Sequence, residues 1–285
     1  CAFAVISPLY ILSRPLLFVF GPLGLIFMNK ISDAFNNKKA FIPFVTAGDP
    51  DLDTTKEILF AMQEGGADLI EIGIPFSDPV AEGPVIQEAD LRALEAGTTT
   101  DHIFDMVRSI KDKLHVPVVF MTYINPIYVY GTEKFARRAK ECGAAGVIVP
   151  DVPFEEKHEL LEIFHEQDLE VVSMIAPTSS ERVKMIAAEA EGFVYCVSSL
   201  GVTGMRSEIS TDIASLIRDV KSVKEIPCAI GFGISTPEQA KKMAAVSDGA
   251  IVGSAIVKIV AEHGKKAPSH VKKYVQSMKS AVEEA

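Results

Sequence analysis

The stretch DLIEIGIPFSDPVAEGP, residues 68–84, says most about the fold of this chain. Its apolar run, Leu69 to Ile74, is interrupted by one carboxylate, Glu71. A Pro- and Gly-rich loop that carries Asp78 and Glu82 follows at once. Such a run is typical of a strand buried on both faces, and strands of this kind form parallel sheets. The stretch therefore predicts a parallel sheet with an acidic loop at the end of one strand.

Glu71 itself suggests chemistry. A carboxylate in a buried strand is costly unless it is paired, hydrogen-bonded or protonated. Lost hydration raises its pKa, which suits a proton-transfer group near neutral pH. The alternative is a structural Glu that caps a loop or pairs with a basic residue, because perturbed carboxylates also occur in structural networks. The strand alone leaves both interpretations open.

Strand-like and helix-like segments alternate along the chain from residue 41 onward. Eight strands followed by helices indicate a (β/α)8 TIM barrel, and an open doubly wound sheet is the alternative. That alternative usually has fewer strands and an early glycine fingerprint, which is missing after the first strand. The predicted strands are Phe41–Val45, Leu69–Ile74, Pro117–Met121, Gly146–Val149, Glu170–Ile175, Gly192–Val197, Pro227–Ile230 and Gly249–Val252.

Extra helices are expected at three places. The interval between the second and third strands contains two helical patterns, Val85–Ala96 and Asp101–Lys113, so one helix is additional. A short helix, Lys30–Phe35, precedes the first strand, and a last helix, Ser269–Glu283, begins at Ser269 as N-cap. We predict one barrel domain over residues 28–285.

Residues 1–27 differ from the rest of the chain. They are apolar with one charge, Arg14, and Pro15 and Pro22 would break a membrane-spanning helix. They lack the basic start and the cleavage site of a secretory signal. We expect the natural protein to begin at Met28, with a leader that is non-native or disordered; a membrane anchor is the alternative.

The composition of the chain restricts its possible partners and its compartment. A net charge of -10 argues against nucleic acid and anionic membranes as partners. The four cysteines show no paired or metal-ligand spacing with the six histidines, which predicts reduced thiols and a cytoplasmic protein.

Polar and glycine-rich segments gather where the predicted strands end, which is the working face of such barrels. Asp49 and Asp151 at these ends also fit turn or cap roles. Backbone N–H groups at glycine-exposed helix starts bind anions, which favours a phosphate site over simple turns. The glycine-rich loops are SSLGVTGMRS (198–207), GFGIS (231–235) and GAIVGSAIV (249–257), with Gly204, Gly233, Gly253 and Ser254 as donors.

From about Met28 to its end, the chain resembles the tryptophan synthase alpha chain family. The motifs that carry the resemblance are PFVTAGDP (43–50), PFSDPVAEGPVIQ (75–87), TYINP (122–126), VPDVPFEE (149–156) and the three glycine-rich loops. The resemblance implies retro-aldol cleavage of indole-3-glycerol phosphate to indole and glyceraldehyde 3-phosphate, with no cofactor in this subunit. It implies Glu71 as the catalytic acid–base. Glu82 stands where the family has an aspartate that accepts the indole N–H. We expect activity to survive this change.

The resemblance also implies further roles. Phe44, Tyr123 and Tyr195 line the indole pocket, and Thr203 helps a loop to close. Gly204, Gly233, Gly253 and Ser254 bind phosphate, while Asp78 and Pro79 meet a beta chain that carries pyridoxal phosphate in an alpha2-beta2 heterotetramer. The alternatives are a stand-alone lyase, a weakly catalytic activator of the beta chain, and a related phosphate-barrel enzyme such as phosphoribosylanthranilate isomerase.

Overall fold

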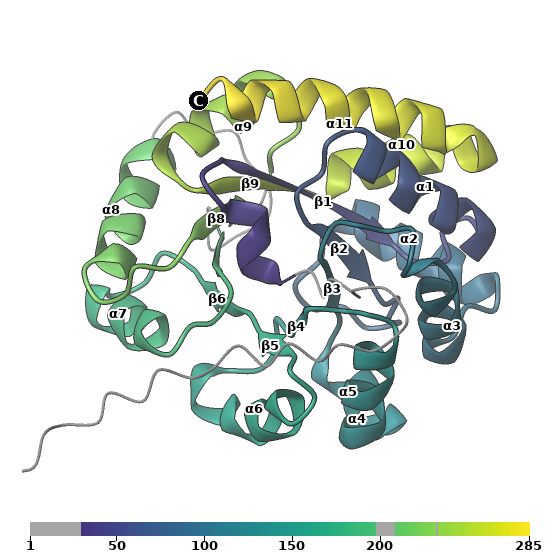
Figure 1. The fold of residues 1–285 in the computed structure, drawn as a ribbon, viewed down its shortest axis with the longest axis horizontal. Helices are drawn as coiled ribbons and strands as arrows, with labels where there is room; N and C mark the ends of the chain where they lie inside the picture. The colour runs from purple at the N-terminus through teal and green to yellow at the C-terminus, as the bar shows by residue number, and fades with distance from the viewer. Residues whose placement is uncertain (1–29, 198–208, 232) are drawn as a thin grey trace, which may run out of the picture.

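The structure, a computed structural model, describes residues 30–197, 209–231 and 233–285. Its described strands form one parallel sheet with the order β5-β4-β3-β2-β1-β9-β8-β7-β6, and helices surround it (Figure 1). The strands are β1 (Ala40–Thr46), β2 (Ile70–Gly73), β3 (Val118–Met121), β4 (Gly146–Ile148), β5 (Glu170–Val171), β6 (Ser173–Ile175), β7 (Val194–Val197), β8 (Cys228–Gly231) and β9 (Gly249–Val252).

The fifth predicted strand is divided in two. Its halves β5 and β6 pair with β4 and β7 respectively, so they form the two edges of the sheet. Only Val172 separates them, and its N–H donates to the carbonyl of Val147 at 2.9 Å. The edges therefore meet within one chain segment, and the predicted barrel is confirmed with a single interruption.

The helices follow the predicted alternation. Both helices expected between β2 and β3 are present, and a second helix also follows β3. The element before β1 is a five-residue 3-10 helix, η1 (Ile31–Phe35), and the last helix starts before Ser269. The others are α1 (Leu52–Glu64), α2 (Pro84–Glu95), α3 (Thr100–Ile110), α4 (Ile124–Tyr130), α5 (Thr132–Glu141), η2 (Phe154–Glu156), α6 (His158–His165), α7 (Ser180–Ala188), α8 (Ile209–Lys221), α9 (Pro237–Val246), α10 (Ser254–His263), η3 (Gly264–Lys266) and α11 (Ala267–Glu283).

Two apolar layers hold the barrel together. Alternate strand residues face the interior, where Ile42, Val119 and Ile251 belong to one buried cluster. Their neighbours face the helices and form the larger cluster. Helix η1 closes the amino-terminal end of the barrel, with the Phe35 and Phe193 rings 5.5 Å apart. Because η1 fills the amino-terminal end of the barrel, a functional site is expected at the carboxyl-terminal end.

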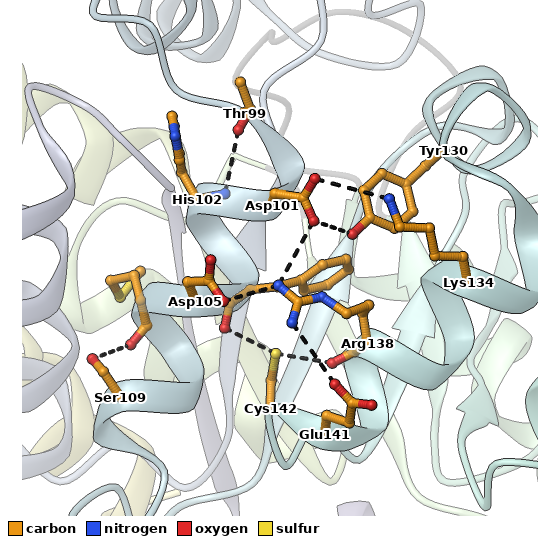
Figure 2. Close-up of polar contacts among 12 residues, drawn as sticks. Thr99, Asp101, His102, Asp105, Ser109, Tyr130, Lys134, Arg138, Glu141 and Cys142 are labelled. Atoms are coloured by element: carbon orange, nitrogen blue, oxygen red, sulfur yellow. Dashed lines mark hydrogen bonds and ion pairs between the residues drawn. The ribbon is translucent and has the colours of Figure 1, made fainter.

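Outer helices are tied by polar contacts as well as by packing. Arg138 on α5 forms ion pairs with Asp105 at 3.0 Å and Asp101 at 3.7 Å on α3 (Figure 2). The Cys142 thiol donates to the Phe104 carbonyl at 3.1 Å in the same network. Within the described ranges, no helix has the length and apolar character needed to cross a membrane.

Candidate active site

Glu71 lies in β2, and its side chain points into the barrel near the end at which the strands have their carboxyl termini. It stands in register between Phe44 of β1 and Val119 of β3, and only 1% of its surface is exposed. Its Oε1 is buried without a hydrogen-bond partner among the described residues. Burial, and secondarily the charge of Glu82, raise the pKa of Glu71 well above its usual range. Burial therefore favours the protonated form of Glu71, and its Oε1 has no hydrogen-bond partner among the described residues.

Glu82 follows β2 in the acidic loop and is half-buried. Its Oε1 accepts a hydrogen bond from the Tyr123 hydroxyl at 3.0 Å, and that hydroxyl accepts the N–H of Ala81 at 3.0 Å. Burial raises the pKa of Glu82, while the bond from Tyr123 lowers it. Because Tyr123 lies between β3 and α4, this contact joins the segments that follow two neighbouring strands.

Phe44 occupies space left by two glycines. An added side-chain carbon at Gly73 would lie 2.5 Å from the Phe44 ring, and one at Gly253 would lie 3.3 Å from it. Glycine at these positions of β2 and after β9 therefore permits the aromatic ring at the site. The same holds for Tyr195 of β7, because a side-chain carbon at Gly231 would lie 2.3 Å from its hydroxyl.

Tyr195 belongs to the same group of side chains as the two acids. It is buried, and its pKa is raised by burial first and then by the charges of Glu71 and Glu82. The structure thus gathers five residues: Phe44, Glu71 and Tyr195 from strands β1, β2 and β7, and Glu82 and Tyr123 from the segments after β2 and β3.

Two of the glycine-rich loops have glycines among the described residues. Gly253 is the N-cap of α10 and Ser254 is its first residue. Gly233 follows β8 with a φ of 76°, and no atom lies within 4 Å of where a side-chain carbon would be. This geometry leaves backbone N–H groups available to an anion. Thr203 and Gly204 lie outside the described residues.

Other acids at the strand ends have structural partners. The carboxylate of Asp151 accepts the N–H of Ile124 at the start of α4, at 3.0 Å. Asp49 forms two 2.8 Å hydrogen bonds with Arg92. Asp78 is exposed in the loop after β2, next to Pro79, and accepts from the Ser77 hydroxyl at 2.5 Å.

Asp90 is a site residue that sequence reasoning missed. It lies on the buried face of α2 and accepts from the Thr46 hydroxyl at 3.4 Å. Burial, with added repulsion from Glu82, raises its pKa to about 7. The sequence did carry a signal for this burial. Asp90 lies at helical spacing between Ile86 and Ala93, on the face of α2 that packs against the barrel.

Together the closed parallel barrel, the buried carboxyl groups and the glycine-rich loops define an acid–base enzyme of the (β/α)8 class. Comparison with known proteins narrows this class: the family model "Tryptophan synthase alpha chain" matches residues 31–285. The chain belongs to the tryptophan synthase alpha chain family. This membership confirms the predicted activity, a lyase reaction on indole-3-glycerol phosphate.

Individual relatives agree with this assignment. The tryptophan synthase alpha chain of Lacticaseibacillus casei is 45% identical over 90% of this chain and 96% of its own length. That of Caldanaerobacter subterraneus subsp. tengcongensis is also 45% identical, over 90% of this chain and 100% of its own. The crystal structure of tryptophan synthase subunit alpha from Legionella pneumophila superposes with a TM-score of 0.81 at 36% identity, covering 90% of this chain and 99% of that one.

Proposed function

We propose that Glu71 performs the proton transfers of indole-3-glycerol phosphate cleavage. The observation that carries this proposal is the buried, unpartnered Oε1 of Glu71 within a group of aromatic side chains. As an acid, Glu71 gives a proton to indole C3. As a base, it then removes the proton of the adjacent side-chain hydroxyl. The carbon–carbon bond breaks, its electron pair returns to the ring, and an aldehyde forms.

Glu82 is proposed as the acceptor of the indole N–H. Protonation at C3 leaves positive charge on the ring, and a nearby carboxylate stabilises that charge. Support comes from the Tyr123 bond, which favours the ionised form of Glu82 and fixes its longer side chain. Phe44, Tyr123 and Tyr195 then enclose the indole, whereas Gly233, Gly253 and Ser254, with Gly204, bind the phosphate.

A partner subunit is also part of the proposed function. Family membership implies a beta chain. We propose an alpha2-beta2 heterotetramer in which pyridoxal phosphate is bound by the beta chain alone and indole passes to it. The exposed Asp78 and the adjacent Pro79 are candidate contacts. Three buried free cysteines, Cys142, Cys196 and Cys228, support a reducing compartment such as the cytoplasm.

An indole-release assay tests these proposals. The purified chain is incubated with indole-3-glycerol phosphate, alone and with a tryptophan synthase beta chain, and indole is measured directly. We expect slow release alone and faster release with the beta chain. Equal rates would indicate a stand-alone lyase. Activation of the beta chain without indole release would indicate an activator and would contradict the role of Glu71.

A further inference from the structure

A cavity lies where the sheet is interrupted, and its lining includes residues of β5, of β6 and of the segment between them. Strand β4 pairs with β5 at two positions only, and β6 pairs with β7. Between the end of β4 and β6 lies a cavity of about 250 Å³, with Pro150 on one side and Ser173 and Met174 on the other. Its lining includes Met174, which also packs against the barrel interior, and Leu160, which belongs to the helix-facing layer.

A buried lysine lines this cavity. Lys157 precedes α6, is only 6% exposed, and donates to the Ser173 hydroxyl at 3.0 Å and the Glu189 carbonyl at 3.3 Å. An ammonium group has three donors, so one has no recorded acceptor among the described residues. The two acids whose charges act on Lys157 contact histidines instead, Glu189 with His158 at 3.9 Å and Glu191 with His165 at 2.9 Å.

Burial of the Lys157 ammonium group costs free energy unless a counter-charge compensates it. A buried charge without an adjacent counter-charge is strongly destabilising. Burial accordingly lowers the pKa of Lys157. The charges of Glu191 and Glu189 oppose this shift, and Lys224 adds a smaller effect in the direction of burial.

Capping of α7 does not account for the buried ammonium group. Lys224 reaches the same helix end from another side, and its Nζ donates to the Ala190 carbonyl at 2.6 Å and the Ala188 carbonyl at 3.5 Å. A cation is therefore already placed at the carboxyl end of α7, where the helix dipole favours it.

We propose that this cavity is a second ligand site, which binds a small amphipathic monocarboxylate by pairing its carboxylate with Lys157 and packing its apolar part against the cavity wall. The other cation at the cavity, Arg182, is neutralised by Glu155 through bonds of 2.6 Å and 3.0 Å. Lys157 is thus the charge left for the ligand. A volume of about 250 Å³ is below that of ordinary drug-sized pockets, so the ligand is about as large as a single substituted ring.

Calorimetric titration with benzoate tests the site in the whole chain. Benzamide is the uncharged control ligand, and Lys157→Met removes the charge. Lys184→Met is the matched variant, because Lys184 lies on α7 outside the cavity lining and pairs with Asp219. We expect benzoate to bind the wild type and Lys184→Met equally, and Lys157→Met at least about tenfold more weakly. Absence of benzoate binding to the wild type, equal binding by Lys157→Met, or equal binding of benzamide would each overturn the proposal.

Methionine methyl NMR locates the ligand without relying on a variant that must fold. The chain has nine methionines, of which Met174 lines the cavity and Met121 contacts the cluster around Phe44 at the active site. We expect benzoate to shift the Met174 signal, assigned with Met174→Leu, and to leave that of Met121 in place. A shift of Met121 alone would place benzoate in the active site and overturn the proposal.

Discussion

Tyr123 holds Glu82 through its phenol oxygen, which donates to Oε1 of Glu82 at 3.0 Å and accepts the N–H of Ala81 at 3.0 Å. One hydroxyl thus fixes both the carboxylate and the backbone next to it. An aspartate at position 82 would be one methylene shorter than the glutamate present. The longer side chain has more rotamers to restrict on ordering, and the Tyr123 bond restricts them.

Tyr123→Phe is expected to weaken catalysis. A hydrogen bond to a charged group contributes about 1.5–3 kcal/mol, so indole release at neutral pH should fall about tenfold or more. Because the bond lowers the pKa of Glu82, its loss should move the acid limb of the pH–rate profile to higher pH. Tyr128→Phe on α4 is the control, since its hydroxyl contacts Glu159 at 2.9 Å. An unchanged profile in Tyr123→Phe would contradict the proposed role.

Glu71→Gln should abolish most activity while stabilising the fold. Loss of general acid–base help lowers indole release by about 10²–10⁴-fold. Because burial raises the pKa of Glu71, its ionised form destabilises the fold, so Glu71→Gln should raise the urea midpoint relative to wild type by more as pH rises.

Glu170→Gln provides the matched control. Its Oε2 is also buried without a recorded partner, and burial also raises its pKa, but Glu170 starts β5 at the other end of the barrel. Glu170→Gln should therefore change the free energy of unfolding and leave indole release unchanged. Equal losses of activity in both variants would remove the case for Glu71 as the proton-transfer group.

Asp90 gives stability a distinct pH dependence. Its pKa is about 7 in the folded protein against an ordinary 3.8, so the folded state binds the proton more tightly between these values. Folding stability therefore falls as pH rises from about 4 to about 7, by up to about 1.4 kcal/mol per unit. Asp90→Asn should remove this part of the slope. Urea unfolding of both proteins across that range measures the difference, and a constant difference would show that Asp90 does not titrate there.

Arg92→Met should destabilise the loop after β1. The guanidinium of Arg92 pairs with Asp49, whose side chain is 2% exposed, so its removal leaves a buried carboxylate unpaired. The expected loss is about 3 kcal/mol in the free energy of unfolding. Arg108→Met on α3 is the control, because Arg108 is exposed. Losses that agree within about 0.5 kcal/mol, the usual range of a surface change, would show that the pair is not stabilising.

Sequence patterns predicted the elements well because the spacing of apolar residues that favours a strand or a helix is a local property of the chain. The run at Leu69–Ile74 and the repeat of glycine before a helix at Gly253 depend on neighbouring residues alone. The division of the fifth strand at Val172 was missed, because it follows from pairing with strands far away in the chain.

The candidate site was predicted in part. The buried strand singled out Glu71 as a candidate, and the family resemblance added Glu82 and the aromatic residues. Asp90 escaped notice, since an acid in an amphipathic helix is normally solvated and only the packing of α2 against β1 buries it.

The sequence by itself determined the barrel, the identity of its acids and the family. The period of the apolar residues, the positions of the glycines and the spacing of the motifs are all properties of the local sequence. Only the tertiary structure decided which groups share an environment. The Tyr123 bond to Glu82 and the burial of Lys157 against β6 join residues that are 41 and 16 positions apart. Ionisation depends on such neighbours and on lost hydration, and both arise only when the strands and helices close around them.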